Sequence, residues 1–494
     1  MKILIVSSEM VPFSKTGGLA DVAGALPKAL KELGHDTRVI IPKYKSDGHL
    51  GITANLLLSG LEIQVGAEKK KANIYETKLP GGTIVYLVES ELFERDGLYQ
   101  ENGRDYPDNA ERFIFFSRAA LALIKAIGWE PHVIHANDWQ TALIPAYIKT
   151  ALAKNIFYNT IATVYTIHNM GYLGVFPADK MPLTGLGWEY FTPDTMEFWG
   201  NVCFSKAGIV YADAINTVSE TYSAEIQTEE FGHGLDGLIR SRSKDVYGIL
   251  NGVDYEVWDP KKDPCLKKHY GASDLRGKAA NKTILRKSCG LSQKKDTPII
   301  GMVSRLTDQK GFDILSGCFE EMMALGIQFV LLGTGDPKYH ELFGSYVKKY
   351  PGQVSVNLGF DSAAAPLIYA GSDMFLMPSK YEPCGLGQLI SFKYGTVPVV
   401  RSTGGLADTV TDLDADPEKG NGFVFKDYTS AALLGTVKRA VSKYSSDKKG
   451  WSAAAKNIME YDYSWNTSAN KYVALYKKAI ENLRTNMYKS RFKA

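Results

Sequence analysis

Apolar and polar positions in the first 42 residues follow the pattern of a strand, a helix and a second strand. The run KILIVSS, which starts at Lys2, is a short apolar stretch of the kind found in buried strands. Apolar residues then recur at helical spacing, at Leu19, Val22, Ala23, Leu26, Leu30 and Leu33. Gly34 is placed to end this helix, Pro27 is expected to bend it, and TRVIIP follows as the next strand. The segment therefore predicts a βαβ unit with two parallel strands.

The same alternation continues along the rest of the chain. Further apolar runs that predict strands are HVIHAND, TVYTIHN, DAINTVS and VYGIL, all before Asn251. Between residues 50 and 88 the alternation is less regular, and the paired glycines at 81 and 82 favour a hairpin inserted in the sheet. After about residue 254 the pattern begins again with PIIGMVS, QFVLLG, VSVNLG, MFLMPS and TVPVV, with helical stretches between them.

These patterns predict an α/β protein with two doubly wound, Rossmann-like domains. Strands that alternate with helices form parallel sheets covered on both faces, and 494 residues are too many for one core. We expect one domain over residues 1–254 and a second over 255–464. The polar stretch 259–278 contains two prolines and is expected to cross between the domains. Residues 465–494 form an amphipathic pattern, and we expect this helix to join the first domain.

Composition narrows the possible partners and the compartment. The net charge of +3 is too small to predict nucleic-acid binding, although it allows a local pocket for an anion. No window approaches the roughly 18 unbroken apolar residues of a membrane span, so we expect no membrane partner. Five scattered cysteines with no zinc-site spacing indicate reduced thiols. The start of the chain reads as a strand rather than a signal or transit peptide, which favours a bacterial cytoplasm over a plastid.

One short phrase occurs twice. TGGLAD begins at Thr16 and again at Thr403, each time between a predicted strand and a predicted helix. Glycines allow a backbone to approach a ligand closely, and the N–H groups at a helix start favour an anion. The two loops are therefore candidate ligand-binding loops, one in each domain, although chance similarity of small residues is the alternative.

Cations follow predicted strands in both domains. Lys15 comes after the first strand, and Arg305 and Lys310 lie in SRLTDQKG after IIGMVS. Ligands of open α/β sheets bind beyond the carboxyl ends of the strands, so these charges favour a diphosphate in a cleft. The chain lacks GxxxxGK[ST] and lacks GxGxxG after its first strand, which excludes the usual P-loop and dinucleotide sites. Each cation alone could equally be a solvated surface side chain.

Other polar residues at predicted strand ends are candidates for binding a sugar. Glu382 lies in EPCGLGQL, where a carboxylate beside the N–H groups of a helix start could bind sugar hydroxyls and an anion. His168 and Asn169 end one strand, and Asp138 and Trp139 end another. Structural alternatives are a helix-capping glutamate and a buried structural histidine.

An acidic segment raises the question of a metal. DLDAD, from Asp412 to Asp416, resembles the Asp-x-Asp signature with which some glycosyltransferases hold a divalent ion. It has no buried strand directly before it and lies among loop-forming residues. We therefore expect a solvated loop, no metal and no cofactor.

Taken together, the motifs resemble a known family. KTGGLADV, HNMGY, GILNGVD, SRLTDQKG, EPCGLGQL and STGGLADTV appear in the order found in bacterial glycogen synthases and plant starch synthases. The similarity covers residues 1–476. It implies a GT-B glycosyltransferase, with two Rossmann-like domains facing across a deep cleft. It also implies metal-independent transfer of glucose from ADP-glucose to the non-reducing end of an α-1,4-glucan such as glycogen, with retention of configuration.

The resemblance also implies roles for individual residues. Lys15, Arg305 and Lys310 would hold the diphosphate, Glu382 would bind sugar hydroxyls, and His168 would lie beside the glucosyl ring. Because Lys15 and Arg305 come from different domains, closure would be needed to assemble the site. With the two glycine loops added, the donor-binding candidates are Gly17, Gly18, Asp21, Asp138, Trp139, Asn169, Asn251, Phe360, Cys384, Gly385, Leu386, Thr403 and Gly404. Phe360 corresponds to an aromatic residue near the adenine.

Two rival interpretations remain open at this stage. A retaining GT-B enzyme that uses UDP-glucose would need the same phosphate contacts, so ADP-glucose rests on the resemblance alone. A non-catalytic glucan-binding scaffold is also possible, although the three cations and Glu382 argue against it. Many retaining GT-B enzymes carry a second glutamate eight positions after the first, where this chain has Ile390, and its absence matches the glycogen synthase branch. Tyr106 and Tyr172 are weak candidates for the glucan surface.

Overall fold

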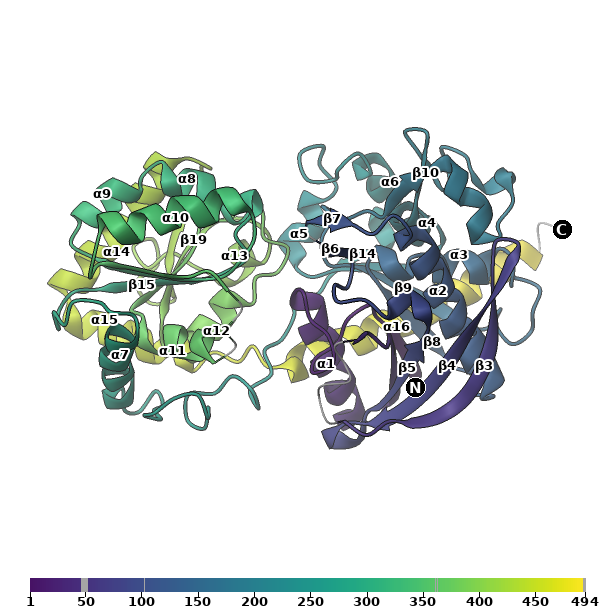
Figure 1. Ribbon diagram of the computed structural model, residues 1–494, viewed down its shortest axis with the longest axis horizontal. Coiled ribbons are helices and arrows are strands. Elements are labelled where there is room, and N and C mark those ends of the chain that lie inside the picture. Colours follow the sequence, from purple (N-terminus) through teal and green to yellow (C-terminus); the bar gives the residue numbers. More distant parts are fainter. Residues whose placement is uncertain (46–51, 102, 360, 362, 492–494) are drawn as a thin grey trace. The chain divides into compact units, whose positions relative to one another are not determined.

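The structure is a computed structural model that describes residues 1–45, 52–101, 103–359, 361 and 363–491. The chain folds into two units, each with its own sheet (Figure 1). Unit 1 comprises Met1–Gly252 and Trp465–Ala494, and unit 2 comprises Val253–Ser464. No helix of the described residues is both long enough and apolar enough to cross a membrane.

Unit 1 is built on a nine-stranded sheet of order β14-β13-β9-β8-β1-β2-β5-β4-β3. The seven strands from β14 to β5 are parallel, and at one edge β4 pairs antiparallel with both β5 and β3. The strands are β1 Lys2–Val6, β2 Asp36–Pro42, β3 Asn55–Val65, β4 Glu68–Lys78, β5 Ile84–Glu89, β8 Val133–Asn137, β9 Ala162–Ile167, β13 Ala214–Thr217 and β14 Val246–Gly248. Two small antiparallel sheets consist of β6 Gln100–Glu101 with β7 Arg104–Asp105, and of β10 Val175–Pro177, β12 Asn201–Cys203 and β11 Glu197–Phe198.

The hairpin expected between residues 50 and 88 exists, but it extends the edge of the sheet rather than interrupting it. β3 and β4 form the hairpin, and β4 then turns into β5 through Pro80–Gly82. Gly81 and Gly82 both have positive φ, 82° and 83°, which explains the paired glycines at this turn. Because β5 pairs in parallel with β2, the hairpin is added beyond the parallel strands.

Helices cover both faces of the unit 1 sheet. They are α1 Gly18–Glu32, α2 Asn109–Ala126, α3 Leu143–Lys149, α4 Phe204–Tyr211, α5 Glu220–Glu225, α6 Asp236–Ser241 and α16 Trp465–Arg491. Short 3₁₀ segments are η2 Pro80–Gly82, η3 Glu91–Phe93, η4 Trp139–Thr141, η5 Ala178–Thr184, η6 Trp188–Tyr190 and η7 Ser243–Asp245. The helix α1 ends as its sequence predicts: Gly34 has φ 82°, its N–H donates to Lys31, and the N–H of His35 donates to Leu30. Pro27 lies inside α1, which continues past it to Glu32.

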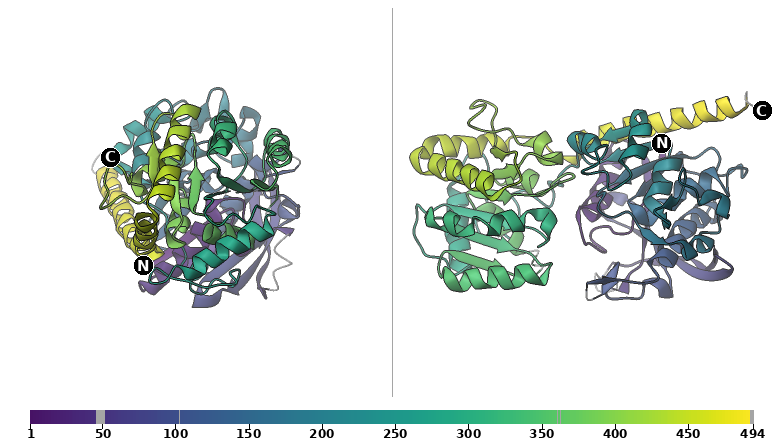
Figure 2. Two further views of the ribbon diagram at one scale, coloured as in Figure 1. Left: turned by 90° about the vertical axis from the view of Figure 1, so that its left-hand side faces the viewer. Right: turned by 90° about the horizontal axis from the view of Figure 1, so that it is seen from above.

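The long helix α16 belongs to unit 1, where it packs on one face of the sheet beside α1 (Figure 2). Its apolar residues, among them Ala469, Leu475 and Ala479, are buried in the same cluster as β1 and β2. Two of its tyrosines also make buried polar contacts with the sheet. The hydroxyl of Tyr476 lies 2.9 Å from His135 Nδ1, and Asn216 Nδ2 donates to the hydroxyl of Tyr472 at 3.1 Å.

Unit 2 contains a six-stranded sheet in which every neighbouring pair is parallel, in the order β17-β16-β15-β18-β19-β20. Its strands are β15 Ile299–Val303, β16 Gln328–Leu332, β17 Val354–Asn357, β18 Met374–Met377, β19 Val397–Arg401 and β20 Phe423–Phe425. Its helices are α7 Arg276–Ser288, α8 Phe312–Ser316, α9 Phe319–Ala324, α10 Pro337–Lys349, α11 Ala364–Gly371, α12 Gly387–Lys393, α13 Gly404–Thr409, α14 Ser430–Ser446 and α15 Lys448–Met459, with the 3₁₀ turn η8 Asp308–Lys310.

The stretch 259–278 was expected to be a crossing between domains, and the structure shows that this expectation is wrong. The stretch packs on unit 2, where Asp263 is buried and accepts a hydrogen bond from the hydroxyl of Tyr394. The hydroxyl of Tyr270 donates to the carbonyl of Tyr394 at 2.8 Å. Polar composition was misleading here because the polar groups find partners inside the fold. The chain passes between the units at residues 252–253 and 464–465 instead.

Candidate functional site

In unit 1, four parallel strands carry the predicted polar residues just beyond their carboxyl ends. Lys15 follows β1, Asp138 follows β8, His168 follows β9 and Asn251 follows β14. Because these strands are parallel members of one sheet, in which β13 separates β14 from β9, their carboxyl ends share one edge. The fold therefore gathers residues that are far apart in sequence at the edge where α/β proteins bind ligands.

His168 is held in a defined orientation by its neighbours. Its Nε2 lies 2.9 Å from Oδ1 of Asn137, while Nδ2 of Asn137 donates to the carbonyls of Val6 and His135 at 3.1 and 3.2 Å. Since Oδ1 can only accept, Nε2 carries the hydrogen and Nδ1 is an acceptor. Burial lowers the pKa of His168 to about 3, so the ring is neutral at physiological pH.

Asp138 occupies a strained position next to His168. Its φ of 55° is positive, an uncommon conformation for a residue other than glycine, and one that recurs at functional sites. The carboxylate Oδ1 accepts the N–H of His168 at 2.7 Å. Burial and, to a smaller extent, the charge of Glu9 raise the pKa of Asp138 to about 7, against backbone hydrogen bonds that lower it. Asp138 can therefore exchange a proton near neutral pH.

Glu9 is a site residue that the sequence analysis missed. It is buried near the start of the loop after β1, and its carboxylate accepts the N–H of Thr16, the hydroxyl of Thr16 at 2.9 Å and the N–H of Gly17 at 3.2 Å. The hydroxyl of Tyr99 donates to it at 3.2 Å. Burial raises the pKa of Glu9, and these hydrogen bonds oppose the rise. The expectation that N–H groups of the first TGGLAD loop are left for an external anion is thus wrong for Thr16 and Gly17, because an internal carboxylate binds them.

The loop that Glu9 holds also carries Lys15. The ammonium of Lys15 pairs with the carboxylate of Asp21 at 2.7 Å, and both side chains remain about one-third exposed, at 34% and 28%. A methyl group built on Gly17 would meet no atom within 4 Å. The backbone of this loop therefore borders open space, with a cation next to it.

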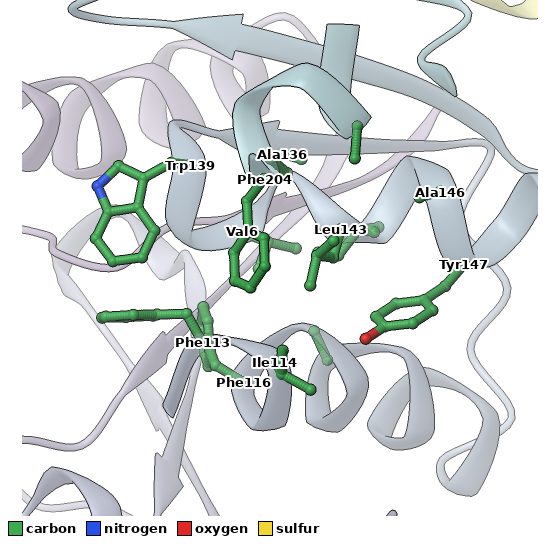
Figure 3. Close-up of a cluster of buried hydrophobic side chains, with 14 of the residues drawn as sticks. Val6, Phe113, Ile114, Phe116, Ala136, Trp139, Leu143, Ala146, Tyr147 and Phe204 are labelled. Carbon is green, nitrogen blue, oxygen red and sulfur yellow. The ribbon is translucent and has the colours of Figure 1, made fainter. Parts of the chain in front are cut away.

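Trp139, the residue after Asp138, belongs to the hydrophobic core of unit 1. It is buried, and its ring centroid lies 4.9 Å from that of Phe113 (Figure 3). The ring centroids of Phe176 and Tyr99 lie 5.6 and 6.4 Å from that of Trp139. Gly174, with φ 63°, packs so closely that a methyl group there would lie 2.7 Å from the indole. Trp139 was predicted to bind the donor, and the described contacts place it in the hydrophobic core of unit 1.

Two asparagines complete the described part of this edge. Asn251 is buried, and within the described residues its Oδ1 has no hydrogen-bond partner. Buried polar atoms normally have partners, so this oxygen is suited to receive a ligand donor. Asn169 turns the chain after β9, since its Oδ1 accepts the N–H of Gly171 at 2.8 Å.

In unit 2, the predicted charged residues follow β15 and β18. Arg305 is exposed in the loop after β15, and among the described residues its guanidinium makes no hydrogen bond or ion pair. Lys310 reaches the buried Glu382 and donates to both carboxylate oxygens, at 2.8 and 2.6 Å. The hydroxyl of Ser379 donates to the same carboxylate at 2.9 Å. The structure thus brings Lys310 and Glu382 together, although the sequence analysis gave them separate contacts with the donor.

The second TGGLAD loop packs against the loop that contains Glu382. The N–H of Gly405 donates to the carbonyls of Glu382 and Pro383, at 3.1 and 3.2 Å. Methyl groups on Gly404 and Gly405 would lie 2.0 and 1.9 Å from the carbonyl oxygens of Glu382 and Cys384. These two glycines therefore serve backbone-to-backbone packing, whereas Gly17 of the first loop faces open space.

The remaining predicted residues of unit 2 surround this contact. Cys384 and Thr403 are buried, Gly385 has φ 72°, and Leu386 precedes α12. Gly18 and Gly404 are the first residues of α1 and α13. Phe360 lies outside the described residues. None of the five cysteines forms a disulfide in the described part of the chain.

The acidic DLDAD segment is partly engaged inside unit 2. The guanidinium of Arg439 binds Asp412 at 3.0 and 2.9 Å and also binds Asp414 at 2.5 Å. Asp412 Oδ2 additionally accepts the N–H of Val424 at 2.7 Å. The expectation of a solvated loop holds for the exposed Asp414 and Ala415 and is wrong for Asp412, which is partly buried and paired. The described residues contain no cluster of three or more His, Cys, Asp or Glu side chains that could hold a metal.

Parallel α/β units with these charged and glycine-rich loops at their carboxyl edges define a glycosyltransferase of the GT-B class. Residues 2–241 match the family described as the starch synthase catalytic domain, and residues 287–458 match glycosyl transferases group 1. The chain is 47% identical over 481 residues to a glycogen synthase of Syntrophotalea carbinolica, which covers 97% of this chain and 99% of that protein. It is 46% identical to a glycogen synthase of Moorella thermoacetica, over 99% of both chains. The chain belongs to the glycogen synthase family.

Solved structures agree with this assignment. The catalytic domain of starch synthase IV from Arabidopsis thaliana, bound to ADP and acarbose, matches with a TM-score of 0.92 and 34% identity over 97% of this chain and 99% of that one. A sucrose-phosphate synthase from Thermosynechococcus elongatus shares the fold, with a TM-score of 0.59 and 15% identity over 97% and 98% of the two chains. The predicted α/β fold class and the predicted glucosyltransferase activity are confirmed.

Proposed function

We propose that this enzyme transfers glucose from ADP-glucose to the non-reducing end of an α-1,4-glucan and retains the configuration at the anomeric carbon. The observation that carries the proposal is the set of charged residues that follows β15 and β18 of unit 2, where Lys310 pairs with the buried Glu382 and Arg305 is exposed in the same loop as Lys310. A guanidinium with no partner among the described residues suits a diphosphate, and a buried carboxylate suits sugar hydroxyls. The ADP and the acarbose in the starch synthase IV structure support the same chemistry.

Charge stabilisation is the first part of the proposed mechanism. When the bond between C1 of glucose and the phosphate oxygen breaks, negative charge develops on the ADP. Preorganised cations aimed at that charge lower the barrier because they interact more strongly with the transition state than with the substrate. Arg305 and Lys310 from unit 2 and Lys15 from unit 1 are the residues that we assign to this task.

Bond formation is the second part. A hydroxyl of the glucan attacks C1 from the face that the phosphate leaves, a C1–O bond forms, and the hydroxyl proton passes to the departing phosphate oxygen. Atoms and charge balance without a covalent glucosyl-enzyme. Because His168 is neutral, it can accept a hydrogen bond from the sugar without placing a positive charge beside the electron-poor C1.

The same proposal includes a location. The relatives named above are bacterial proteins, and none of the described cysteines is in a disulfide, as expected in a reducing compartment. We therefore assign the enzyme to the bacterial cytoplasm.

A donor panel tests the proposal directly. Purified enzyme is mixed with glycogen and with ADP-glucose, UDP-glucose or GDP-glucose, and nucleoside diphosphate release is measured with and without EDTA. We expect release that depends on glycogen, favours ADP-glucose and survives EDTA. Preference for UDP-glucose would overturn the donor assignment. Loss of activity in EDTA that manganese restores would overturn the metal-free mechanism. The Arg305→Ala enzyme serves as the negative control.

A further inference from the structure

A hairpin of unit 1 presents a tryptophan to solvent in an unfavourable backbone conformation. Phe198 in β11 pairs with Asn201 in β12, so Trp199 and Gly200 form a two-residue turn. Both have positive φ, 54° and 78°. The side chain of Trp199 is 82% exposed, which is unusual for such a large apolar group.

Neither turn chemistry nor packing explains this residue. Two-residue hairpins with positive φ at both central positions strongly prefer Asn-Gly, Asp-Gly or Gly-Gly. A bulky side chain at positive φ is strained, and exposure means that Trp199 regains little of that cost by burial. An observed strain of this kind is a reason to look for a binding role.

A second turn with the same irregularity lies against the first. The N–H of Leu235 donates to the carbonyl of Gly232 at 2.9 Å, which closes a turn around His233 and Gly234. These two residues also have positive φ, 49° and 81°. A methyl group on Gly234 would lie 3.2 Å from the ring of Phe198 and 3.6 Å from Nε1 of Trp199. Two turns, each with an aromatic residue where asparagine is preferred, therefore meet at Phe198.

The surroundings of Trp199 favour a sugar over another protein. The carboxylate of Glu197 accepts the N–H of Gly200 at 2.7 Å, and Nδ2 of Asn201 donates to the carbonyl of Trp199 at 3.1 Å. Charged groups are depleted from the core of protein interfaces. A glucosyl ring instead offers a C–H face to an aromatic ring and hydroxyls to polar groups at its margin.

This sheet is also joined to the site already described. β10, which pairs with β12, carries Phe176, and the Phe176 ring packs 5.6 Å from Trp139, measured between ring centroids. The carbonyl of Gly174, just before β10, accepts the N–H of Phe204 at 3.0 Å. A polymeric substrate that reaches the edge near His168 can therefore contact a second surface of the same unit.

We propose that Trp199 and His233 form a subsite for the polymeric glucan, separate from the residues that act on the transferred glucose. This inference rests on the proposed function, because it assumes a glucan acceptor. The subsite raises affinity for long chains and leaves the chemical step unchanged.

Asparagine substitutions test the subsite because they separate binding from folding. Trp199→Asn and His233→Asn place the preferred residue in each turn, so neither variant should have a lower unfolding midpoint than the wild type. Ile156→Ala is the matched control, since Ile156 is an apolar side chain of unit 1 with the same 82% exposure. Each enzyme is assayed with glycogen and with maltotriose as acceptors.

We expect Trp199→Asn to raise KM for glycogen at least about fivefold, which corresponds to one aromatic contact, with kcat within twofold. KM for maltotriose should not change, and Ile156→Ala should match the wild type in both assays. An unchanged KM for glycogen, or an equal rise for maltotriose, would overturn the subsite. A change in oligomeric state of Trp199→Asn by sedimentation, with unchanged glycogen affinity, would assign the surface to a second copy instead.

A failure of the proposed glucosyltransferase function can be distinguished from a failure of the proposed subsite. If the wild type releases no nucleoside diphosphate with either acceptor, the glucosyltransferase proposal fails. Co-sedimentation of wild type and Trp199→Asn with glycogen still measures the subsite in that case. Equal co-sedimentation of the two would overturn it.

Discussion

Gly17 and Gly404 hold equivalent positions in the two TGGLAD loops, yet their surroundings differ. A methyl group on Gly17 meets no atom within 4 Å, and this residue has an extended φ of −154°. A methyl group on Gly404 meets the carbonyl oxygen of Glu382 at 2.0 Å, and its φ is 44°. The same sequence therefore forms a loop whose backbone borders open space in unit 1 and a loop that packs closely on another backbone segment in unit 2.

Alanine substitutions at the two positions should have opposite consequences. Gly404→Ala should lower the free energy of unfolding by about 2–4 kcal/mol, because it combines a positive φ with a backbone clash. Gly17→Ala should change it by less than about 0.5 kcal/mol. We expect Gly17→Ala to lower kcat/KM for ADP-glucose at least about tenfold, since the methyl group occupies space next to Lys15. Urea denaturation and initial rates check both, and a fully active Gly17→Ala enzyme would contradict the ligand role.

Asp138 predicts a pH dependence of stability whose sign can be worked out. Its pKa is about 7 in the folded protein against 3.8 for the ordinary group. Between these values the folded state keeps a proton that the unfolded state has lost, so the stability contributed by this group falls as pH rises from about 4 to 7. His135 and His168, with pKa values lowered to about 3, have the opposite trend, since their contribution is lost as pH falls below about 6.5.

Comparison with Asp138→Asn isolates the aspartate from the two histidines. We expect the urea midpoint of the wild type, relative to that of Asp138→Asn, to decrease steadily from pH 4.5 to pH 7.5. The histidine contributions cancel in this difference. Parallel profiles of the two proteins would show that Asp138 is ionised throughout the range.

At the scale of elements, most of the architecture could be predicted from the sequence. Every apolar run that was predicted to be a strand contains one in the structure, from KILIVSS with β1 to TVPVV with β19. The prediction succeeds because buried parallel strands are continuous apolar segments. The short strand β20 was missed, since FVF is too brief to stand out. The prediction that residues 259–278 cross between the domains was wrong, because polar groups of this stretch are buried with partners in unit 2.

The arrangement of the site was harder to predict than its position. The predicted positions of Lys15, Asp138, His168, Arg305 and Glu382 after strand ends agree with the structure, whereas their role in a site remains a prediction. The carboxylate of Glu9 was missed because one of its hydrogen-bond partners, Tyr99, is 90 residues away in sequence. The contact between Lys310 and Glu382 spans 72 residues. A signal existed for Glu9, since it is the first charged residue after β1, but nothing local shows what a side chain will meet.

The contribution of a buried polar contact between α16 and the unit 1 sheet to stability can be measured. Tyr476→Phe removes the partner of His135 Nδ1 and leaves a buried nitrogen unsatisfied. We expect a loss of about 1–3 kcal/mol in the free energy of unfolding. Tyr488→Phe on the same helix is the control, because Tyr488 is 66% exposed. Equal midpoints for the two variants in urea would show that the His135 contact contributes nothing.

At the scale of the whole molecule, the proposed mechanism requires both units to act on one diphosphate. Arg305→Ala should lower kcat at least about 100-fold, the scale of losing one preorganised donor. If Lys15 and Arg305 stabilise the same charge, the loss in Lys15→Ala/Arg305→Ala should be smaller than the product of the two single losses. Arg276→Ala is the control in unit 2, since its side chain is 92% exposed. Independent, multiplicative losses would contradict a shared diphosphate.

The position of α16 has a consequence for synthesis of the chain. The ribosome makes residues 465–491 only after the whole of unit 2, yet this helix covers a face of the sheet that β1 and β2 begin. A nascent chain therefore carries an uncovered apolar face through most of its translation, and the intervening unit can fold first. Chaperones that recognise exposed apolar segments should bind this face, and chains interrupted before Trp465 should aggregate or be degraded.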